Sequence, residues 1–251
     1  MAKVARWVAE AERVVVLTGA GISTDSGIPD FRGPNGVWTK NPAAEKSSDI
    51  RYYVADPEVR KVAWQGRLHH PAWTAEPNAG HSALAELDRT GRLLMLVTQN
   101  VDGLHQRAGV PPERVVEIHG TVTRVVCLSC DDRRPMAYAL DRVRAGEADP
   151  ACEICDGILK SDTISFGQSL VEADLRRAEA AAASADLLLT VGTTLTVYPV
   201  AALPAIAQQA GARVVTINGQ ETAFDDRADA VVRGQIGDLL PDVVGVAGNL
   251  T

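Results

Sequence analysis

Long apolar runs are missing from this chain of 251 residues, and so are internal repeats and low-complexity tracts. A membrane-spanning helix needs about 20 consecutive apolar residues, and a signal peptide needs an apolar stretch near its start. Residues 1–11 instead have the pattern of a short amphipathic helix, with Val4, Trp7 and Val8 on one side. We therefore expect no membrane span and no signal peptide, and we expect a cytoplasmic protein.

An excess of positive charge is also lacking, since 25 Lys and Arg face 32 Asp and Glu and give a net charge of −7. General binding to nucleic acid phosphates depends on neutralisation by basic residues, so this balance argues against it. Hydrophobic residues make up 46% and charged residues 23%, which is typical of a globular protein. A chain of this length can bury a full core and add a small second module.

Cysteine is scarce, with only four residues, and all of them fall into two Cys-x-x-Cys pairs. Cys127 and Cys130 form the first pair, Cys152 and Cys155 the second, and residues 131–151 separate them. This spacing predicts one tetrahedral zinc site with four thiolate ligands. Two disulfides or two redox-active pairs are the alternatives, and the absence of a secretion signal weighs against them. Four thiolates leave no position for water, so we expect the metal to be structural.

Short β-branched runs alternate with helical patterns along most of the chain, which predicts a doubly wound, Rossmann-like α/β fold with a parallel sheet. The predicted strands are 13–18, 93–98, 115–119, 186–191, 213–217 and 230–232. The predicted helices between them are 80–89, 171–184 and 199–210.

Two stretches, 39–80 and 121–160, do not follow this alternation. The first contains Pro, Trp and charged residues without a buried-strand run, and the second contains the four cysteines. We expect both to form a smaller, zinc-binding module inserted into the nucleotide-binding domain. That domain would then consist of residues 1–38, 81–120 and 161–251.

The first predicted strand leads directly into a glycine turn, Gly19-Ala20-Gly21-Ile22. A strand, a glycine turn and a helix form the usual binding site for a dinucleotide pyrophosphate. The third glycine of the usual fingerprint is replaced by Thr24, and the acidic residue expected after a second strand is not evident, so a simple tight turn remains an alternative. The loop that follows places Asp30, Phe31 and Arg32 side by side, a combination that a nucleotide site can use.

At these residues the chain resembles the sirtuins, the NAD-dependent protein deacylases. Seven motifs occur in the order that is typical of the family, namely residues 19–33 (GAGISTDSGIPDFRG), 98–105 (TQNVDGLH), 119–120 (HG), the four cysteines, 165–168 (SFGQ), 192–199 (GTTLTVYP) and 217–218 (IN). The resemblance implies a protein-lysine deacetylase that consumes NAD and releases nicotinamide, O-acetyl-ADP-ribose and free lysine. It also implies acyl-lysine peptides or proteins as partners, and it leaves the oligomeric state open.

The resemblance further implies roles for individual residues. His119 would be the general base, because imidazole can be neutral near pH 7, and Asn100 would assist it. For a histidine considered alone, a structural position remains the alternative. The NAD contacts implied by the motifs are Gly19, Ala20, Gly21, Ile22, Ile28, Asp30, Phe31, Arg32, Gln99, Asn100, Asp102, Gly192, Thr193, Thr194, Asn218 and Ile236.

The acyl-lysine peptide is expected to bind as an added strand between a strand over residues 165–168 and the segment 196–198, with Phe166, Gly167, Val197 and Tyr198 in contact. Sirtuins that remove acidic acyl groups carry a Tyr-x-x-Arg motif in the small-domain helix. At the corresponding positions this chain has Trp64 and Arg67. The arginine is present but the tyrosine hydroxyl is missing, so we assign both residues to the acyl site and expect acetyl-lysine to be preferred; a solvated helix position remains the alternative for Arg67. Lys160-Ser161 and Gln168 depart from the family's usual Lys-Pro and Glu, and these changes leave the substrate preference open.

Other functions remain alternatives on the sequence alone. Within the same fold these are a deacylase for succinyl or long-chain groups and a mono-ADP-ribosyltransferase. Outside it, they are a non-enzymatic zinc-ribbon binding protein and a dehydrogenase that transfers hydride. Residues 38–50 are expected to form a mobile loop that closes over NAD, because they contain few apolar anchors.

Overall fold

The computed structural model describes residues 1–245 except 32, 34–35 and 41–47. Its central feature is a six-stranded parallel sheet in the order β3-β2-β1-β7-β8-β9. The strands are β1 Val14–Thr18, β2 Leu93–Thr98, β3 Val115–Glu117, β7 Leu187–Val191, β8 Arg213–Ile217 and β9 Ala230–Val232. This order confirms the predicted doubly wound fold, since the chain runs outward from β1 in one direction and from β7 in the other.

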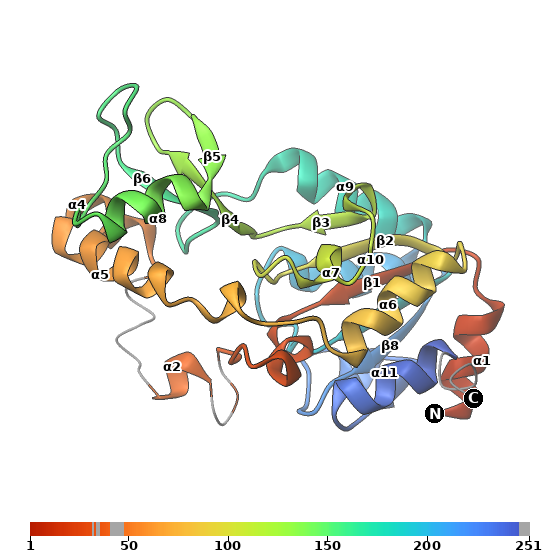
Figure 1. Cartoon of the computed structure of the whole chain (residues 1–251). Coiled ribbons are helices and arrows are strands. Elements are labelled where there is room, and N and C mark those ends of the chain that lie inside the picture. Colours follow the sequence, from red (N-terminus) through yellow and green to blue (C-terminus); the bar gives the residue numbers. More distant parts are fainter. Residues whose placement is uncertain (32, 34–35, 41–47, 246–251) are drawn as a thin grey trace.

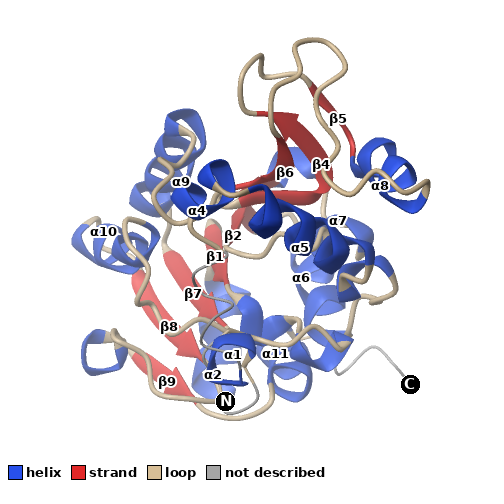
Figure 2. Ribbon diagram, turned by 90° about the vertical axis from the view of Figure 1, so that its left-hand side faces the viewer, coloured by secondary structure: helices blue, strands red, loops and turns tan. Residues whose placement is uncertain are grey.

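Helices cover both faces of this sheet (Figures 1 and 2). One face is packed by α1 (Ala2–Glu10), α6 (Ala79–Arg89) and α11 (Ile236–Val244). The other face is packed by α9 (Glu172–Ser184) and α10 (Leu203–Gln209). Successive residues of β1 alternate between the two cores, with Val14 and Val16 on the α6 side and Val15 and Leu17 on the α9 side. A strand that is buried on both faces needs this continuous apolar sequence.

A second, antiparallel sheet lies beside the first and has the order β5-β4-β6. Its strands are β4 Gly120–Cys127, β5 Arg133–Pro135 and β6 Leu159–Thr163, and the helices beside it are α4 Ile50–Ala55, α5 Pro57–Leu68 and α8 Met136–Arg144. A separate core of buried residues from these elements includes Trp64, Val125, Met136, Leu140 and Leu159. We call these six elements the small module, which lies to one side of the large sheet in Figure 1.

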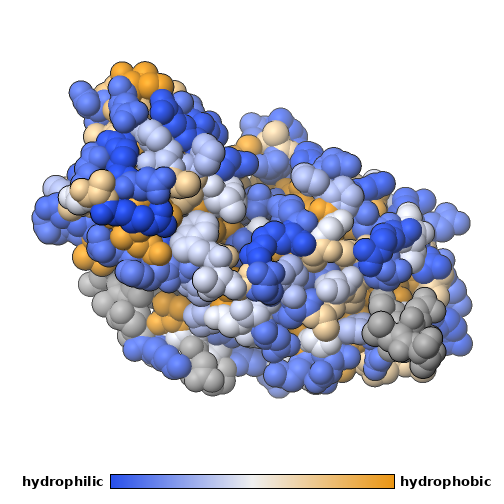
Figure 3. All heavy atoms as spheres, in the orientation of Figure 1, coloured by the Kyte–Doolittle hydropathy of each residue, from blue (hydrophilic) through white to orange (hydrophobic). Residues whose placement is uncertain are grey.

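The other α-helices of the described residues are short: α2 is Val37–Lys40 and α7 is Leu104–Arg107. No helix in the described parts of the chain is long and apolar enough to cross a membrane. On the face shown in Figure 3, apolar residues form small patches that are separated by hydrophilic ones.

Candidate active site

The carboxyl ends of five neighbouring strands bring the predicted site residues to one edge of the large sheet. In sheet order, the residues at these ends are His119 after β3, Gln99 and Asn100 after β2, Gly19–Ile22 after β1, Gly192–Thr194 after β7, and Asn218 after β8. The strand order reverses between β1 and β7. Ligands of open α/β sheets bind at such a switch point, outside the carboxyl ends of the strands.

Three glycines, Gly19, Gly21 and Gly192, form the centre of this edge. A Cβ atom added to Gly19 or Gly21 would lie 2.8 Å from backbone atoms of Gly192. The Gly21 N–H donates to the Gly192 carbonyl oxygen over 2.9 Å. The loops that follow β1 and β7 are therefore in direct backbone contact, with no room for a side chain between them, and we call this closely packed main chain the glycine surface. Ile236 packs beside Gly192 at the start of α11, because a Cβ at Gly192 would lie 2.9 Å from its Cδ1.

A buried polar cluster lies behind this surface and contains Ser23, Asn100 and Asp102. The Ser23 hydroxyl donates to Asp102 Oδ2 over 2.8 Å, and Asn100 Nδ2 donates to Ser23 Oγ over 3.0 Å. The Leu104 N–H donates to Asp102 Oδ1 over 2.9 Å. Asp102 is only 6% exposed and its donors are neutral groups, so its carboxylate can accept a further hydrogen bond from a ligand such as a carboxamide.

Two buried histidines support this cluster from beneath. His81 Nε2 lies 3.4 Å from Ser23 Oγ, and His105 Nε2 lies 3.0 Å from Thr18 Oγ1. Burial lowers the pKa of His81 to about 4 and also lowers the pKa of His105. Both rings are therefore neutral at pH 7 and act as hydrogen-bonding groups, not as charges.

His119 lies between β3 and β4, at the edge of the glycine surface. Its Nδ1 atom is 3.1 Å from the carbonyl oxygen of Gln99. A carbonyl can only accept, so Nδ1 must carry the proton, and the neutral ring presents Nε2 as a base. Burial lowers the pKa of His119, which keeps the ring neutral at pH 7. Gln99 is held in turn by its Nε2, which donates to Thr193 Oγ1 over 2.9 Å.

Gly120 allows the chain to turn from β3 into β4 directly after this histidine. Its φ angle is +74°, and an added Cβ would lie 2.1 Å from the Asp162 carbonyl oxygen. The Ile164 N–H donates to the His119 carbonyl oxygen over 2.8 Å. The backbone of His119 is therefore tied to the segment that leaves β6 toward residues 165–168.

The residues predicted to bind the peptide lie on two loops. Phe166 is 39% exposed and Tyr198 is 74% exposed. The prediction of a strand over 165–168 is wrong, because Gln168 Oε1 accepts from the Ser165 N–H and forms a turn. Only Phe166 has strand-like pairing, through an isolated bridge to Asp49 with two backbone hydrogen bonds to Ser48 and Ile50.

The two residues assigned to the acyl site, Trp64 and Arg67, lie on α5 of the small module. Trp64 has no exposed surface and packs in the core around Cys127, so its ring is not accessible to a substrate in this structure. The Arg67 guanidinium lies 4.5 Å from the Trp64 ring centroid and donates to the Tyr53 hydroxyl over 3.1 Å. Tyr53, on α4, was not among the predicted site residues, because it is distant from Arg67 in the sequence.

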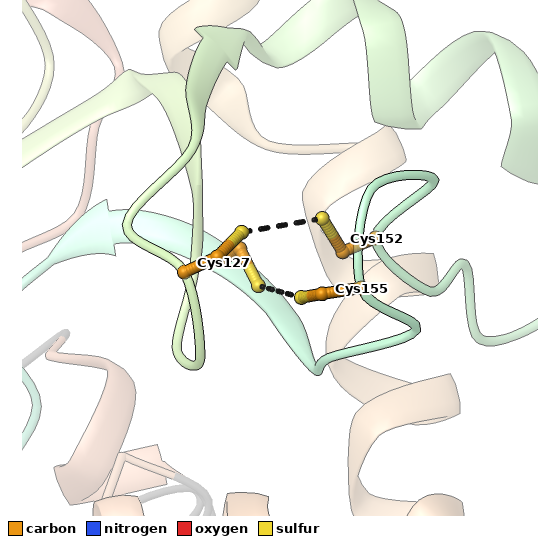
Figure 4. A group of neighbouring side chains, drawn as sticks. Cys127, Cys152 and Cys155 are labelled. Atoms are coloured by element: carbon orange, nitrogen blue, oxygen red, sulfur yellow. Dashed lines mark hydrogen bonds between the residues drawn. The ribbon is translucent and has the colours of Figure 1, made fainter.

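The four cysteines meet at the end of the small module, and Figure 4 shows the thiols of Cys127, Cys152 and Cys155 pointing toward one another. Their four Sγ atoms lie within 4.8 Å of one another. The separations of 3.6 Å for Cys127–Cys155 and 3.7 Å for Cys130–Cys152 are too long for disulfides. Tetrahedral zinc with bonds of about 2.3 Å places its sulfur ligands about 3.8 Å apart, so the cluster fits one zinc ion.

The remaining predicted contacts lie on the loop after the glycine turn. Asp30 Oδ1 accepts from the Gly33 N–H over 3.0 Å, Ile28 is half-buried, and Phe31 is 45% exposed. Arg32 and most of the predicted mobile loop, residues 41–47, lie outside the described residues.

The Sir2 family model matches residues 19–199. The chain belongs to the Sir2 family. Its relatives include NAD-dependent protein deacetylase 2 of Streptomyces coelicolor, which is 48% identical over 91% of this chain and 95% of that protein. NAD-dependent protein deacetylase 1 of Bradyrhizobium diazoefficiens is 42% identical over 95% of this chain and 92% of that protein.

Solved Sir2 structures have the same fold over nearly the whole chain. A Sir2 variant with a deacetylated p53 peptide and 3′-O-acetyl-ADP-ribose superposes with a TM-score of 0.90 at 33% identity, covering 99% of this chain and 98% of that one. A Sir2 complex with a p53 peptide and NAD⁺ gives a TM-score of 0.85 at 33% identity, covering 97% and 96%.

Several polar residues in the site of this Sir2 protein were not predicted from the sequence. Ser23 stands inside the first motif but was not assigned a role, although it links Asn100 to Asp102. His81 lies outside the sequence motifs; it caps α6 together with Asn78 and is fully buried. The signal available in the sequence was its place on the apolar face of α6, one turn before Leu84 and Ala85.

Proposed function

We propose that this chain is an NAD-dependent protein-lysine deacetylase that converts NAD, water and acetyl-lysine peptides into nicotinamide, O-acetyl-ADP-ribose and free lysine. The arrangement of His119 carries the proposal. Its ring is neutral, its Nδ1 is committed to the Gln99 carbonyl, and it lies at the same sheet edge as the glycine surface. Bound NAD supplies a ribose carbon that accepts the acyl oxygen as nicotinamide leaves.

The residues of this chain would bind and orient NAD and the peptide, and they would move a proton. Nε2 of His119 takes the proton of a ribose hydroxyl, and the Gln99 carbonyl stabilises the imidazolium that forms. Asn100 is a neutral donor and acceptor that can hold a ribose hydroxyl without adding charge. Asp102 would accept from the nicotinamide carboxamide, in line with its unshared acceptor capacity and neutral donors.

The other contacts follow from the same sheet edge. The backbone of Gly19, Ala20, Gly21 and Ile22, together with Gly192, Thr193 and Thr194, would bind the phosphates, and Asn218 and Ile236 would contact the adenosine. Ile28, Asp30, Phe31 and Arg32 would cover the nicotinamide side. Phe166, Gly167, Val197 and Tyr198 would bind the peptide main chain. We leave Trp64 out of this set because it is buried, and we retain Arg67 only as a residue that contacts Tyr53 and Trp64.

The four-cysteine cluster would hold one structural zinc ion, since four thiolates leave no open position. We propose that residues 39–80 and 121–160 form the small zinc-binding domain. Residues 1–38, 81–120 and 161–251 would form the NAD-binding domain. We further propose a cytoplasmic enzyme without general affinity for membranes or nucleic acid.

Mass spectrometry of the products tests the function directly. The protein is incubated with NAD and matched peptides that carry acetyl-lysine or unmodified lysine, and His119→Ala is the control variant. We expect nicotinamide and O-acetyl-ADP-ribose only with the acetyl peptide and the unaltered protein. ADP-ribose attached to the peptide or protein would instead indicate a transferase, and reduced nicotinamide would indicate hydride transfer. Either result, without deacetylated peptide, would overturn the proposal.

A further inference from the structure

Lys160 is a buried lysine in β6 whose role is not explained by the cofactor site. The residue is only 1% exposed. The Nζ atom donates to the carbonyl oxygens of Ser161 and Thr163, over 3.0 and 2.5 Å, and lies 3.4 Å from Thr163 Oγ1. These acceptors are oxygen atoms of its own strand, and none of the three is a carboxylate. A buried ammonium costs free energy unless it is paired, so its position calls for a function.

The position of β6 explains which carbonyls this lysine serves. β6 is an edge strand of the sheet β5-β4-β6. Alternate residues of a strand direct their carbonyls to the same edge, and an edge lacks the partners that a neighbouring strand would supply. Here the Leu159 carbonyl accepts from the Tyr53 hydroxyl over 2.7 Å, and Lys160 serves the carbonyls of Ser161 and Thr163. Side-chain donors therefore replace a missing strand along this edge.

The pairing of β6 with β4 is also interrupted at this point. Regular pairing runs from Leu159 to Ser161, and the next pair, Gly120 with Thr163, follows a break in register. Beyond the end of β6 the chain continues to Ile164, whose N–H donates to the His119 carbonyl oxygen, and on to Phe166 and Gly167. Lys160 thus fixes the last residues of β6 where the sheet itself holds them least.

We propose that Lys160 is a positioning residue for the substrate peptide, and that its bonds to the Ser161 and Thr163 carbonyls hold the segment Ile164–Gly167 in the register that a peptide strand needs. The proposal rests on the proposed function, because it concerns the same peptide site. An added strand is bound mainly through main-chain hydrogen bonds, so its affinity depends on how well the receiving backbone is fixed.

The effect should fall on the peptide and not on NAD. Within the described parts of the chain, the hydrogen bonds of Lys160 go to β6 and not to the glycine surface or the Ser23 cluster. Burial lowers its pKa to about 7, with Arg67 lowering it as well and Asp162 opposing them. The Nζ atom keeps hydrogens to donate as an ammonium and as a neutral amine, so the contact to both carbonyls persists on either side of this pKa.

Steady-state kinetics with an acetyl-lysine peptide test the proposal in the full chain loaded with zinc. Lys160→Met removes the donors at similar side-chain length, and Lys160→Arg keeps donors at the same position. Lys61→Met is the matched control, because Lys61 lies on α5 of the same module and pairs with exposed Glu58 at 2.6 Å. Losing one buried charge-assisted hydrogen bond corresponds to about a tenfold change in an equilibrium constant or more.

We expect Lys160→Met to raise the peptide KM about tenfold, while kcat and the NAD KM stay within about twofold of the unaltered protein. We expect Lys160→Arg to have a peptide KM close to that of the unaltered protein. Lys61→Met should leave all three values unaltered. An unchanged peptide KM in folded Lys160→Met, or a loss confined to kcat, would overturn the proposal.

A second measurement covers the case in which Lys160→Met folds poorly. Hydrogen exchange of the Ile164–Gly167 amides is then compared between the unaltered protein and Lys160→Gln, which retains a shorter donor. Faster exchange confined to this segment supports the proposed positioning role of Lys160, and equal exchange refutes it. If the unaltered protein neither deacetylates nor binds the labelled acetyl peptide in a fluorescence anisotropy titration, the proposed function fails first. Measurable binding without turnover would leave the Lys160 proposal to be decided by peptide affinity alone.

Discussion

Gly120→Ala tests how strictly the turn after His119 depends on the absence of a side chain. The φ angle of Gly120 is +74°, a left-handed conformation that costs a residue with a Cβ about 1–2 kcal/mol. The new Cβ would lie 2.1 Å from the Asp162 carbonyl oxygen and 2.9 Å from Thr163 Cα. Both are backbone atoms, so no side-chain rotation can relieve the contact.

Relief requires β4 and β6 to move apart by about 1 Å, because carbon and carbonyl oxygen normally approach to about 3.3 Å. Overpacking of this kind costs about 1–3 kcal/mol. Gly120→Ala should therefore reduce the free energy of unfolding by about 2–5 kcal/mol. Since a misplacement of about 1 Å in a catalytic group can cost about 100-fold, kcat should also fall by at least about tenfold.

Gly91→Ala provides the matched control. Its φ angle is +75°, and an added Cβ would have no atom beyond its chain neighbours within 4 Å, so it meets only the backbone strain. Urea unfolding of both variants, with zinc present and NAD absent, gives the two losses of stability, and deacetylation kinetics give kcat. If both variants lose the same stability and keep the same kcat, the close approach of β4 and β6 is not what makes glycine necessary at residue 120.

Four further predictions concern the chemistry. His119→Ala should lower kcat by about 10²- to 10⁴-fold and leave NAD binding intact, as calorimetry with NAD can check. Because burial lowers the pKa of His119, the base is neutral above that value, and kcat should be flat through pH 7 and fall only on acidification; a decline that begins above pH 7 would contradict this. Removing zinc with a chelator should loosen the small module and abolish activity, and zinc should restore both; a metal-free, folded and fully active protein would exclude a structural role. Acetyl-lysine should give a higher kcat/KM than succinyl-lysine, since the Tyr53 hydroxyl near Arg67 already donates to Leu159 and Trp64 is buried; an equal or higher succinyl value would refute it.

The large sheet could be predicted from the sequence because its strands are buried on both faces and read as unbroken apolar runs. Residues 93–98, 213–217 and 230–232 match the observed strands, and all six predicted strands lie in one parallel sheet. The third strand ends at Glu117 instead of residue 119, since the chain turns at Gly120 into the second sheet. The helix predicted over 199–210 begins as a short 3-10 turn and becomes α-helical at Leu203.

The site was predictable where motifs follow strand ends, and less so where contacts join distant segments. The four cysteines and the residues after β1, β2 and β7 came from local patterns. The contact of Tyr53 with Arg67 and the support of Ser23 by His81 depend on how helices pack, which spacing does not specify. For Trp64 the sequence motif and the packing point in different directions: its motif position assigns it to the acyl site, and its ring is fully buried in the core of the small module.

The contact between the loops after β1 and β7 restricts how this protein can change during evolution. Gly19, Gly21 and Gly192 meet backbone against backbone, so a side chain gained at one of them cannot be compensated by a smaller residue at another. The first substitution at any of these three glycines is therefore already unfavourable, whereas the surrounding strands can exchange one apolar residue for another. The same property is useful in engineering: Gly192→Ala would place a methyl group against the backbone of Gly21 and Ile22 and force the two loops apart, while every catalytic side chain remains in the protein.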